Sequence, residues 1–242
     1  MSERGFYVGY LALPREHGAL FRVLVPALML VMLGLGIAVG AAQRSPGSAV
    51  WDTSREIALR GVLLHDPYPL LIDSEGHTHL IVEVGKQGPR EAIRRFVGAV
   101  ELRGWLLERG GISMIELRPD ASAIASAPGV AVLPEATQPG EAVELFGEVL
   151  DSKCYLGAMK PGDGKGHKAC ATLCVEGGIP PMFYATRADG GRSHFLLTTS
   201  AGQTARGVVL AYIGEPVRVR GTLDRIGDLP ILRLEAGGVT RR

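Results

Sequence analysis

The residues with the clearest chemical potential are three cysteines and one histidine in a glycine-rich segment. Cys170 and Cys174 are four residues apart, so in a helix their side chains share one face. His167 precedes Cys170 by three residues and belongs to the same face. Cys154 follows an expected strand and can approach from across the loop. Three thiolates and one imidazole are a common ligand set for zinc, copper or iron, so the sequence predicts a metal site.

Three other interpretations of these cysteines stay open. Two of them could form a disulfide if the region is exported, leaving the third as a free thiol or an attachment point. They could instead form a thiol redox switch, or be ordinary buried side chains. The spacing C-x15-C-x3-C fits neither a c-type haem site nor a ferredoxin. Its C-x3-C part is similar to copper sites of the respiratory-oxidase type, although the histidine is placed differently.

Glycines and prolines are expected to shape this segment. A long glycine-rich loop is usually either functional or disordered, and the clustered cysteines favour function. A pair of glycines after Cys174 would end a short helix there. The loop-shaping candidates are Gly157, Gly177, Gly178, Pro180 and Pro181.

Other residues that often carry chemistry are expected to be structural. His77 and His79 would lie on one face of a strand and could form a pair of ligands, but an exposed flank of a turn is the favoured interpretation. No serine–histidine–acid set and no pair of carboxylates stands out as catalytic. The sequence therefore nominates no catalytic residue and does not favour an enzyme. Structural roles are also expected for His65, Tyr68 and His194.

The soluble region contains a duplicated pattern. Gly61 aligns with Gly147 in the opening strand of each half, and Gly104 aligns with Gly221 near the end of each half. Apolar residues alternate around these glycines, which is typical of half-buried strands. Between these points the second half is longer, and the extra residues include the cysteines. The second half alone is therefore expected to carry the chemistry.

The order of elements in each half predicts a small β-barrel. Strand, turn, strand, short helix, strand and strand is the order of the five-stranded OB-fold. Residues 91–97 and 204–212 are the candidate short helices. With 33 glycines, 15 prolines and 6% aromatic residues, the composition suits short strands and tight turns. We expect a mainly β protein with one N-terminal transmembrane helix and two tandem OB-like barrel units, the second with a Cys/Gly-rich insertion.

The expected organisation has five segments. A tail precedes an apolar helix, and an Ala/Ser/Pro-rich linker separates the two β units. The segments are a cytoplasmic N-terminal tail (1–22), a transmembrane helix (23–43), a first OB-like unit (52–119), a linker (120–139) and a second OB-like unit (140–239).

The run from Val23 to Gln43 contains no charged residue. At about 1.5 Å per residue it spans roughly 30 Å, the thickness of a bilayer core. A cleaved signal peptide is the alternative, with small residues at 39–41 as the cleavage site. The apolar run is longer than a signal peptide requires and starts far from the N-terminus, so an anchor is favoured.

Arginines near the ends of this run predict its orientation. Arg4, Arg15 and Arg22 precede it, whereas Arg44 and Arg55 follow it. The small excess on the N-terminal side predicts a cytoplasmic N-terminus and an extracytoplasmic C-terminal region. The expected location is therefore the inner (cytoplasmic) membrane, crossed once, with the β units in the periplasm.

The segment DSKCYLG…HKACATLCVEGGIPP resembles that of an uncharacterised group of membrane-anchored or exported bacterial proteins. The resemblance covers the anchored N-terminus as well. Members accompany redox enzymes, which implies a membrane or periplasmic redox protein as partner. It marks Cys154, His167, Cys170 and Cys174 as the site without specifying the ligand.

Two functions follow from the sequence. The first is an extracytoplasmic accessory protein with a Cys/His metal or thiol redox site that serves a redox or electron-transfer system. The second is a structural or assembly subunit of a membrane complex, with the cysteines as a disulfide staple. Nucleic acid is not an expected partner, because the net charge is +1 and the pI is near 7.8.

Overall fold

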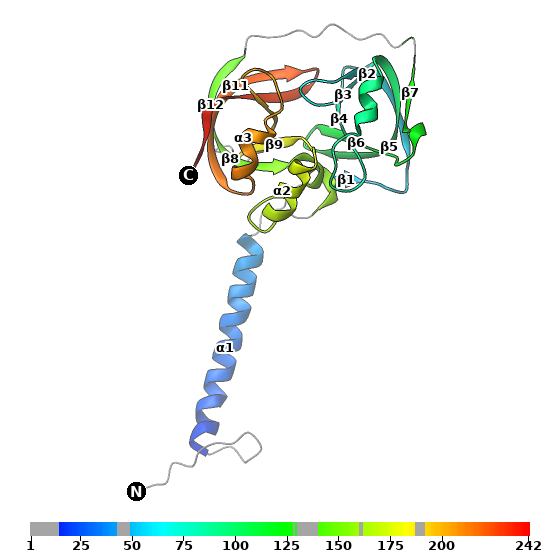
Figure 1. Cartoon of the computed structure of the whole chain (residues 1–242). Helices are drawn as coiled ribbons and strands as arrows, with labels where there is room; N and C mark the ends of the chain where they lie inside the picture. Colours follow the sequence, from blue (N-terminus) through cyan, green and yellow to red (C-terminus); the bar gives the residue numbers. More distant parts are fainter. Residues whose placement is uncertain (1–14, 43–48, 128, 130–139, 160–161, 187–191) are drawn as a thin grey trace. The chain divides into compact units, whose positions relative to one another are not determined.

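The computed structural model describes residues 15–42, 49–127, 129, 140–159, 162–186 and 192–242. The chain divides into two compact units, Met1–Pro46 and Gly47–Arg242. Among the described residues, the first unit contains one helix and the second contains the β structure, shown in cyan to red in Figure 1.

The N-terminal unit is built on helix α1, Arg15–Ala42. Its stretch His17–Ala42 is long and apolar enough to cross a membrane. The predicted span lies within this helix except for Gln43, which lies outside the described residues. Pro26 sits inside the helix. Because α1 begins at Arg15, the helix extends before the charge-free run and includes Arg22.

The first β unit is a five-stranded ring with two added strands. Strands β5, β2, β3, β4 and β6 pair in that order, and β5 also pairs with β6, which closes the ring. The β4–β6 pair is parallel and the other pairs are antiparallel. Strands β1 and β7 pair with β5 outside the ring. The strands are β1 (Val50–Trp51), β2 (Ile57–Leu64), β3 (Leu70–Asp73), β4 (Thr78–Val82), β5 (Gly98–Arg109), β6 (Ile112–Leu117) and β7 (Ile124–Ser126).

The second β unit repeats this topology as a closed barrel in the order β10-β12-β11-β8-β9. Its parallel strand pair, β10 with β12, corresponds to β4 with β6. The structure therefore confirms two tandem OB-like units in the described residues. The strands are β8 (Glu141–Asp151), β9 (Pro181–Thr186), β10 (Arg192–Thr199), β11 (Pro216–Ile226) and β12 (Leu229–Arg241).

The four aligned glycines explain why the two halves look alike in sequence. A Cβ atom on Gly61 would collide with a carbonyl oxygen of β3, and one on Gly147 would collide with a carbonyl of β9. Gly104 and Gly221 meet carbonyls of β6 and β12 in the same way. Both barrels therefore need glycine where a strand curves closely over its neighbour.

The short helices occupy corresponding positions in the two units. The 3-10 helix η1, Glu91–Arg95, lies between β4 and β5. Helix α3, Arg206–Val209, and the 3-10 turn η4, Leu210–Tyr212, lie between β10 and β11. Both predicted helices are confirmed, each shorter than the sequence pattern indicates.

The predicted linker starts too early. The turn η2, Ala121–Ala123, and strand β7 belong to the first sheet, because β7 pairs with β5. The alanines and serines of this stretch are typical of a loop. However, the side chain of Ile124 is buried, and its burial favours packing of this segment on the sheet. Of the remaining linker residues, 128 and 130–139 lie outside the described residues.

The two barrels pack on each other through a shared apolar core. One buried cluster combines residues of the first barrel, such as Leu80 and Met114, with residues of the second, such as Met182 and Leu196. Tyr68 is buried there, donates to the carbonyl of Leu197 at 2.9 Å and accepts from the amide of Ala205 at 2.9 Å. Tyr68 thus has the structural role expected of it.

Candidate metal centre

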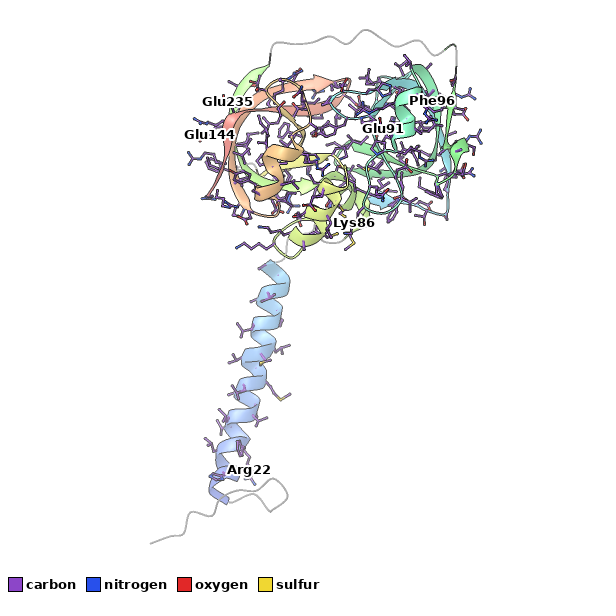
Figure 2. The ribbon with its side chains drawn as sticks, viewed as in Figure 1. Arg22, Lys86, Glu91, Phe96, Glu144 and Glu235 are labelled. Carbon is purple, nitrogen blue, oxygen red and sulfur yellow. The ribbon has the colours of Figure 1, made fainter. Side chains whose placement is uncertain are left out.

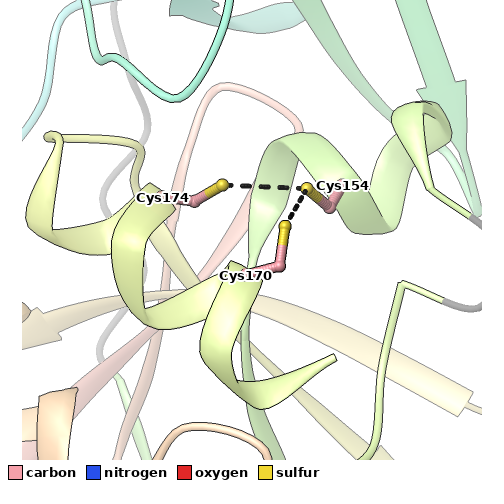
Figure 3. A group of neighbouring side chains, drawn as sticks. All are labelled: Cys154, Cys170 and Cys174. Atoms are coloured by element: carbon pink, nitrogen blue, oxygen red, sulfur yellow. Dashed lines mark hydrogen bonds between the residues drawn. The ribbon is translucent and has the colours of Figure 1, made fainter. Parts of the chain in front are cut away.

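The three cysteine sulfurs converge on one point beside the second barrel. Cys154 lies at the start of η3, Cys154–Ala158, a π-helical turn just after β8. Cys170 and Cys174 lie on helix α2, Lys168–Glu176. The Cys154 Sγ is 3.9 Å from that of Cys170 and 3.7 Å from that of Cys174 (Figure 3). All three sulfurs lie within 4.8 Å of one another, and we name them the thiol cluster.

Local sequence rules explain how each cysteine reaches this point. Asp151 ends β8, and its carboxylate accepts the backbone N–H of Cys154 at 2.8 Å, which starts the turn. One turn of α2 separates Cys170 from Cys174, so the expected shared face is confirmed. After Glu176 the chain leaves the helix through Gly177 and Gly178, whose φ of +98° favours glycine.

The other loop-shaping candidates have clear places. Pro180 is buried, and its carbonyl accepts the N–H of Ser152 at 3.2 Å, while Pro181 begins β9. Gly157 has an extended φ, so its conformation does not itself require glycine. A Cβ atom at position 157 would crowd Trp51, so glycine is favoured there because a side chain has no room.

The thiol cluster is mostly shielded from solvent. Cys154 is 5% exposed and Cys174 is 1% exposed, whereas Cys170 is partly exposed and offers the open side. The three cysteines, all in the described part of the chain, are free thiols. Their sulfurs are separated by far more than the ~2 Å of a disulfide. The structure therefore contains no disulfide among these three cysteines.

His167 belongs to a second group rather than to the thiol cluster. Its Nε2 lies 3.1 Å from Oδ2 of Asp151, and both side chains are buried. Asp151, Cys154 and His167 have ligand atoms within 4.8 Å of one another. The structure thus divides the predicted four-ligand set into two groups that share Cys154. The helical spacing placed His167 correctly near the cysteines but could not reveal its carboxylate partner.

A lysine of the first barrel completes the site. Lys86, labelled in Figure 2, lies in the loop between β4 and η1, and its Nζ donates to Cys170 Sγ at 2.6 Å and lies 4.0 Å from Cys174 Sγ. All residues of the two candidate ligand groups lie in the second half, as expected, but the first half adds Lys86 to their surroundings. No motif marks Lys86 in the sequence, because the contact joins residues far apart in the chain.

Close backbone packing brings the Lys86 loop to α2. The N–H of Gly88 donates to the carbonyl of Gly177 at 2.9 Å. A Cβ atom on Gly177 would collide with the carbonyl oxygen of Lys86. Gly177 therefore both follows the helix end and leaves room for the loop of the first barrel.

Lys153, next to Cys154, also contacts the loop that carries Lys86. Its buried Nζ donates to the carbonyls of Glu83 and Gly85, each at 2.7 Å. It also forms an ion pair with Glu116 of β6 at 2.5 Å. These contacts tie the start of the cysteine segment to the first barrel.

The contacts polarise the thiol cluster. The hydrogen bond from Cys154 lowers the pKa of Cys174, and the charge of Lys86 acts in the same direction. The same hydrogen bond, together with burial, raises the pKa of Cys154. A hydrogen bond to Cys170 raises the pKa of Lys86, and one to Asp151 raises that of His167. The environment therefore favours ionisation of Cys174 over that of Cys154.

The remaining histidines differ in environment. His65 Nε2 lies 2.8 Å from the carbonyl oxygen of Phe96, and His194 Nε2 lies 2.5 Å from the hydroxyl of Tyr155, in keeping with structural roles. His77 is exposed as expected. His79 is not, because it is 7% exposed and faces Asp73. The prediction of an exposed turn flank is therefore wrong for His79, since β4 is buried along its length.

Comparisons with protein-family models, curated proteins and solved structures find no match to this chain.

Proposed function

We propose that this chain is a membrane-anchored, extracytoplasmic metal-binding protein that serves a redox or electron-transfer system. The observation that carries the proposal is the convergence of three cysteine sulfurs within 4.8 Å of one another. Such a cluster of soft donors is suited to a soft or borderline metal ion. Helix α1 supports the anchor, and the excess of arginine before its apolar run supports the orientation.

The donor set favours copper(I) among copper, zinc and iron. Thiolate ligands suit copper(I), zinc and iron alike, but structural zinc takes four ligands in a tetrahedral arrangement and this cluster supplies three sulfurs, a number that copper(I) accepts. The three sulfurs converge without His167, which belongs to the neighbouring group with Asp151 and Cys154. Lys86 supplies a positive charge that offsets the excess negative charge of three thiolates around a monovalent ion.

A partner protein is also part of this proposal. Cys170 lies on the partly exposed side of the cluster, so a donor or acceptor of the metal ion or electron would approach there. The exposed Leu173 and Met159 lie in the same segment. A membrane or periplasmic redox protein is the partner class that suits an anchored soft-metal site.

A thiol redox switch is the second candidate. The sulfur distances of 3.7 and 3.9 Å favour it, because side-chain rotation could bring Cys154 to bonding distance of either neighbour. Lys86 beside Cys170 also favours reactivity, since a neighbouring cation stabilises a thiolate.

Anaerobic titration of the full-length protein in detergent separates the two candidates. We expect one copper(I) ion per chain in competition with a copper(I) chelator, with sulfur ligation in X-ray absorption spectra. Serine at Cys154, Cys170 or Cys174 should weaken copper binding at least tenfold, whereas the control Met159→Leu should not. Parallel titrations with zinc and iron(II) test the choice of metal.

Two results would overturn the metal proposal. One is a wild-type protein that binds none of the three metals while all its thiols react with a thiol reagent. The other is unchanged copper affinity in all three serine variants. Formation of one disulfide under mild oxidation, without metal binding, would establish the redox switch instead.

A further inference from the structure

Polar side chains line a pocket that contains none of the three cysteines. The pocket has a volume of about 540 Å³ and is bordered by the strands β4 and β6, by the hairpin turn between β5 and β6, and by the β11–β12 turn. We name it the histidine pocket. Its lining includes His77, His79, Glu108, Gly110, Ser113 and Asp228.

Two of these residues, His79 and Ser113, form a hydrogen-bonded chain with Asp73, which lies outside the pocket lining. Strands β4 and β6 are parallel, and their register places His79 opposite Ser113. The Ser113 hydroxyl lies 2.6 Å from Nδ1 of His79, and it donates there when the ring carries its proton on Nε2. On the other side of the ring, Nε2–H of His79 donates to Oδ2 of Asp73 at 3.1 Å. Ser113, His79 and Asp73 are therefore arranged as a nucleophile, a base and a group that orients the base.

The hydrogen bonds around Asp73 favour its ionised form. Its Oδ1 accepts the backbone N–H groups of Glu75 and His77, each at 2.9 Å. Burial opposes ionisation, but hydrogen bonds from His79 and these two amides lower the pKa of Asp73. A fixed carboxylate holds the proton of His79 on Nε2 and leaves Nδ1 free to accept a proton from Ser113.

The base His79 and the nucleophile Ser113 differ in their exposure to solvent. His79 is 7% exposed, so the imidazole is protected from bulk water, whereas Ser113 is partly exposed and lines the pocket. Thr78, between the two histidines, is fixed by the carboxylate of Asp228, which accepts its N–H at 2.7 Å. The second barrel therefore holds the strand that carries the base.

We propose that Ser113, His79 and Asp73 form an acyl-transfer site that hydrolyses small, uncharged esters. The lining mixes acidic and basic residues with Val50 and Ile112, which favours a neutral substrate over a strongly charged one. The glycine turn at 110–111 borders the pocket without side chains, so an ester can approach the backbone there.

The reaction uses water as the second reactant. The Ser113 oxygen attacks the ester carbonyl carbon while its proton passes to Nδ1 of His79. The tetrahedral intermediate collapses, the bond to the alcohol oxygen breaks, and the leaving alkoxide takes the proton from His79. Water then attacks the acyl-serine with His79 as base, which releases the acid and restores Ser113. The sum is ester plus water giving acid plus alcohol.

The ring nitrogens are exchanged relative to serine proteases, where the nucleophile faces Nε2 and the acid faces Nδ1. The exchange does not alter the chemistry, because either nitrogen of a neutral imidazole can accept a proton while the other donates. The site uses none of the cysteines and no metal, so it stands or falls separately from the proposed metal site.

A fluorophosphonate probe on the full-length protein tests the proposal. We expect one covalent adduct per chain, located at Ser113 by mass spectrometry of peptides. Ser113→Ala should abolish it, and Asp73→Asn and His79→Gln should slow its formation by about 10²-fold or more, in the range known for triads. Ser122→Ala is the matched control, because the Ser122 hydroxyl bonds the carboxylate of Asp120 and has no imidazole beside it.

Hydrolysis of p-nitrophenyl acetate gives an independent readout. A Cys170→Ser background removes acylation of the exposed thiol. We expect saturable turnover that Ser113→Ala lowers at least 100-fold and Ser122→Ala leaves unchanged. Circular dichroism must show that the variants fold. Absence of a Ser113 adduct on folded wild-type protein, or equal hydrolysis by folded Ser113→Ala, would show that the chain of hydrogen bonds is only structural.

Discussion

Replacing Lys153 with methionine removes the positive member of a buried ion pair that joins the two barrels. The side chains of Lys153 and Glu116 are 4% and 6% exposed, and the methionine stem fills most of the same space. The change leaves the Glu116 carboxylate buried without its cation. It also removes the donor to the carbonyls of Glu83 and Gly85.

The expected loss of stability follows from these contacts. Removing one partner of a buried ion pair costs about 3–5 kcal/mol, because the remaining charge is neither solvated nor paired. We therefore expect Lys153→Met to lower the free energy of unfolding by about 3–5 kcal/mol. The surface pair Arg60–Glu101 provides the control, since Arg60 is 70% exposed and Arg60→Met should cost less than about 1 kcal/mol.

Urea unfolding of the full-length protein in detergent, followed by tryptophan fluorescence, measures this effect. Trp51 packs against the core shared by the barrels and so reports on their separation. The double variant Lys153→Met/Glu116→Gln should recover at least half of the loss, because the unpaired charge is gone. A loss below about 1 kcal/mol for Lys153→Met, or additive losses in the double variant, would refute the reasoning.

Two further predictions concern the packing around the site. Burial, together with Arg109 and Arg192, lowers the pKa of His194 to about 4. As the pH falls, His194 of the unfolded chain therefore takes up a proton before His194 of the folded chain does. The contribution to stability is complete above pH 6.5 and should fall by about 2 kcal/mol as the pH approaches 4. This loss is smaller than the whole pKa shift would give, because solvent reaches part of the ring. Urea midpoints between pH 4.5 and 7.5 should show this slope in wild type and lose it in His194→Gln; parallel slopes would contradict it. Gly177→Ala should cost about 1–3 kcal/mol in the same assay, because the new Cβ meets the carbonyl of Lys86, whereas Gly166→Ala, with open space, should be nearly neutral; equal costs would contradict the close packing.

Sequence periodicity determined the elements of this protein because their signals are local. A charge-free apolar run fixes α1, and alternating apolar residues around the paired glycines fix the duplicated strands. The helical spacing of Cys170 and Cys174 fixes their shared face. Each of these properties depends on residues within one turn or one strand, so neighbouring residues suffice to read it.

The tertiary structure alone decided which distant residues meet. Lys86 reaches Cys170 because the barrels dock, and nothing in its own neighbourhood marks it. His167 looks like a cysteine-cluster ligand by spacing, but the end of β8 places Asp151 against it. Ser113 and His79 become neighbours through a parallel pairing that the chain forms only when the first barrel closes. Such contacts depend on strand register and domain docking, which side-chain spacing along the sequence does not encode.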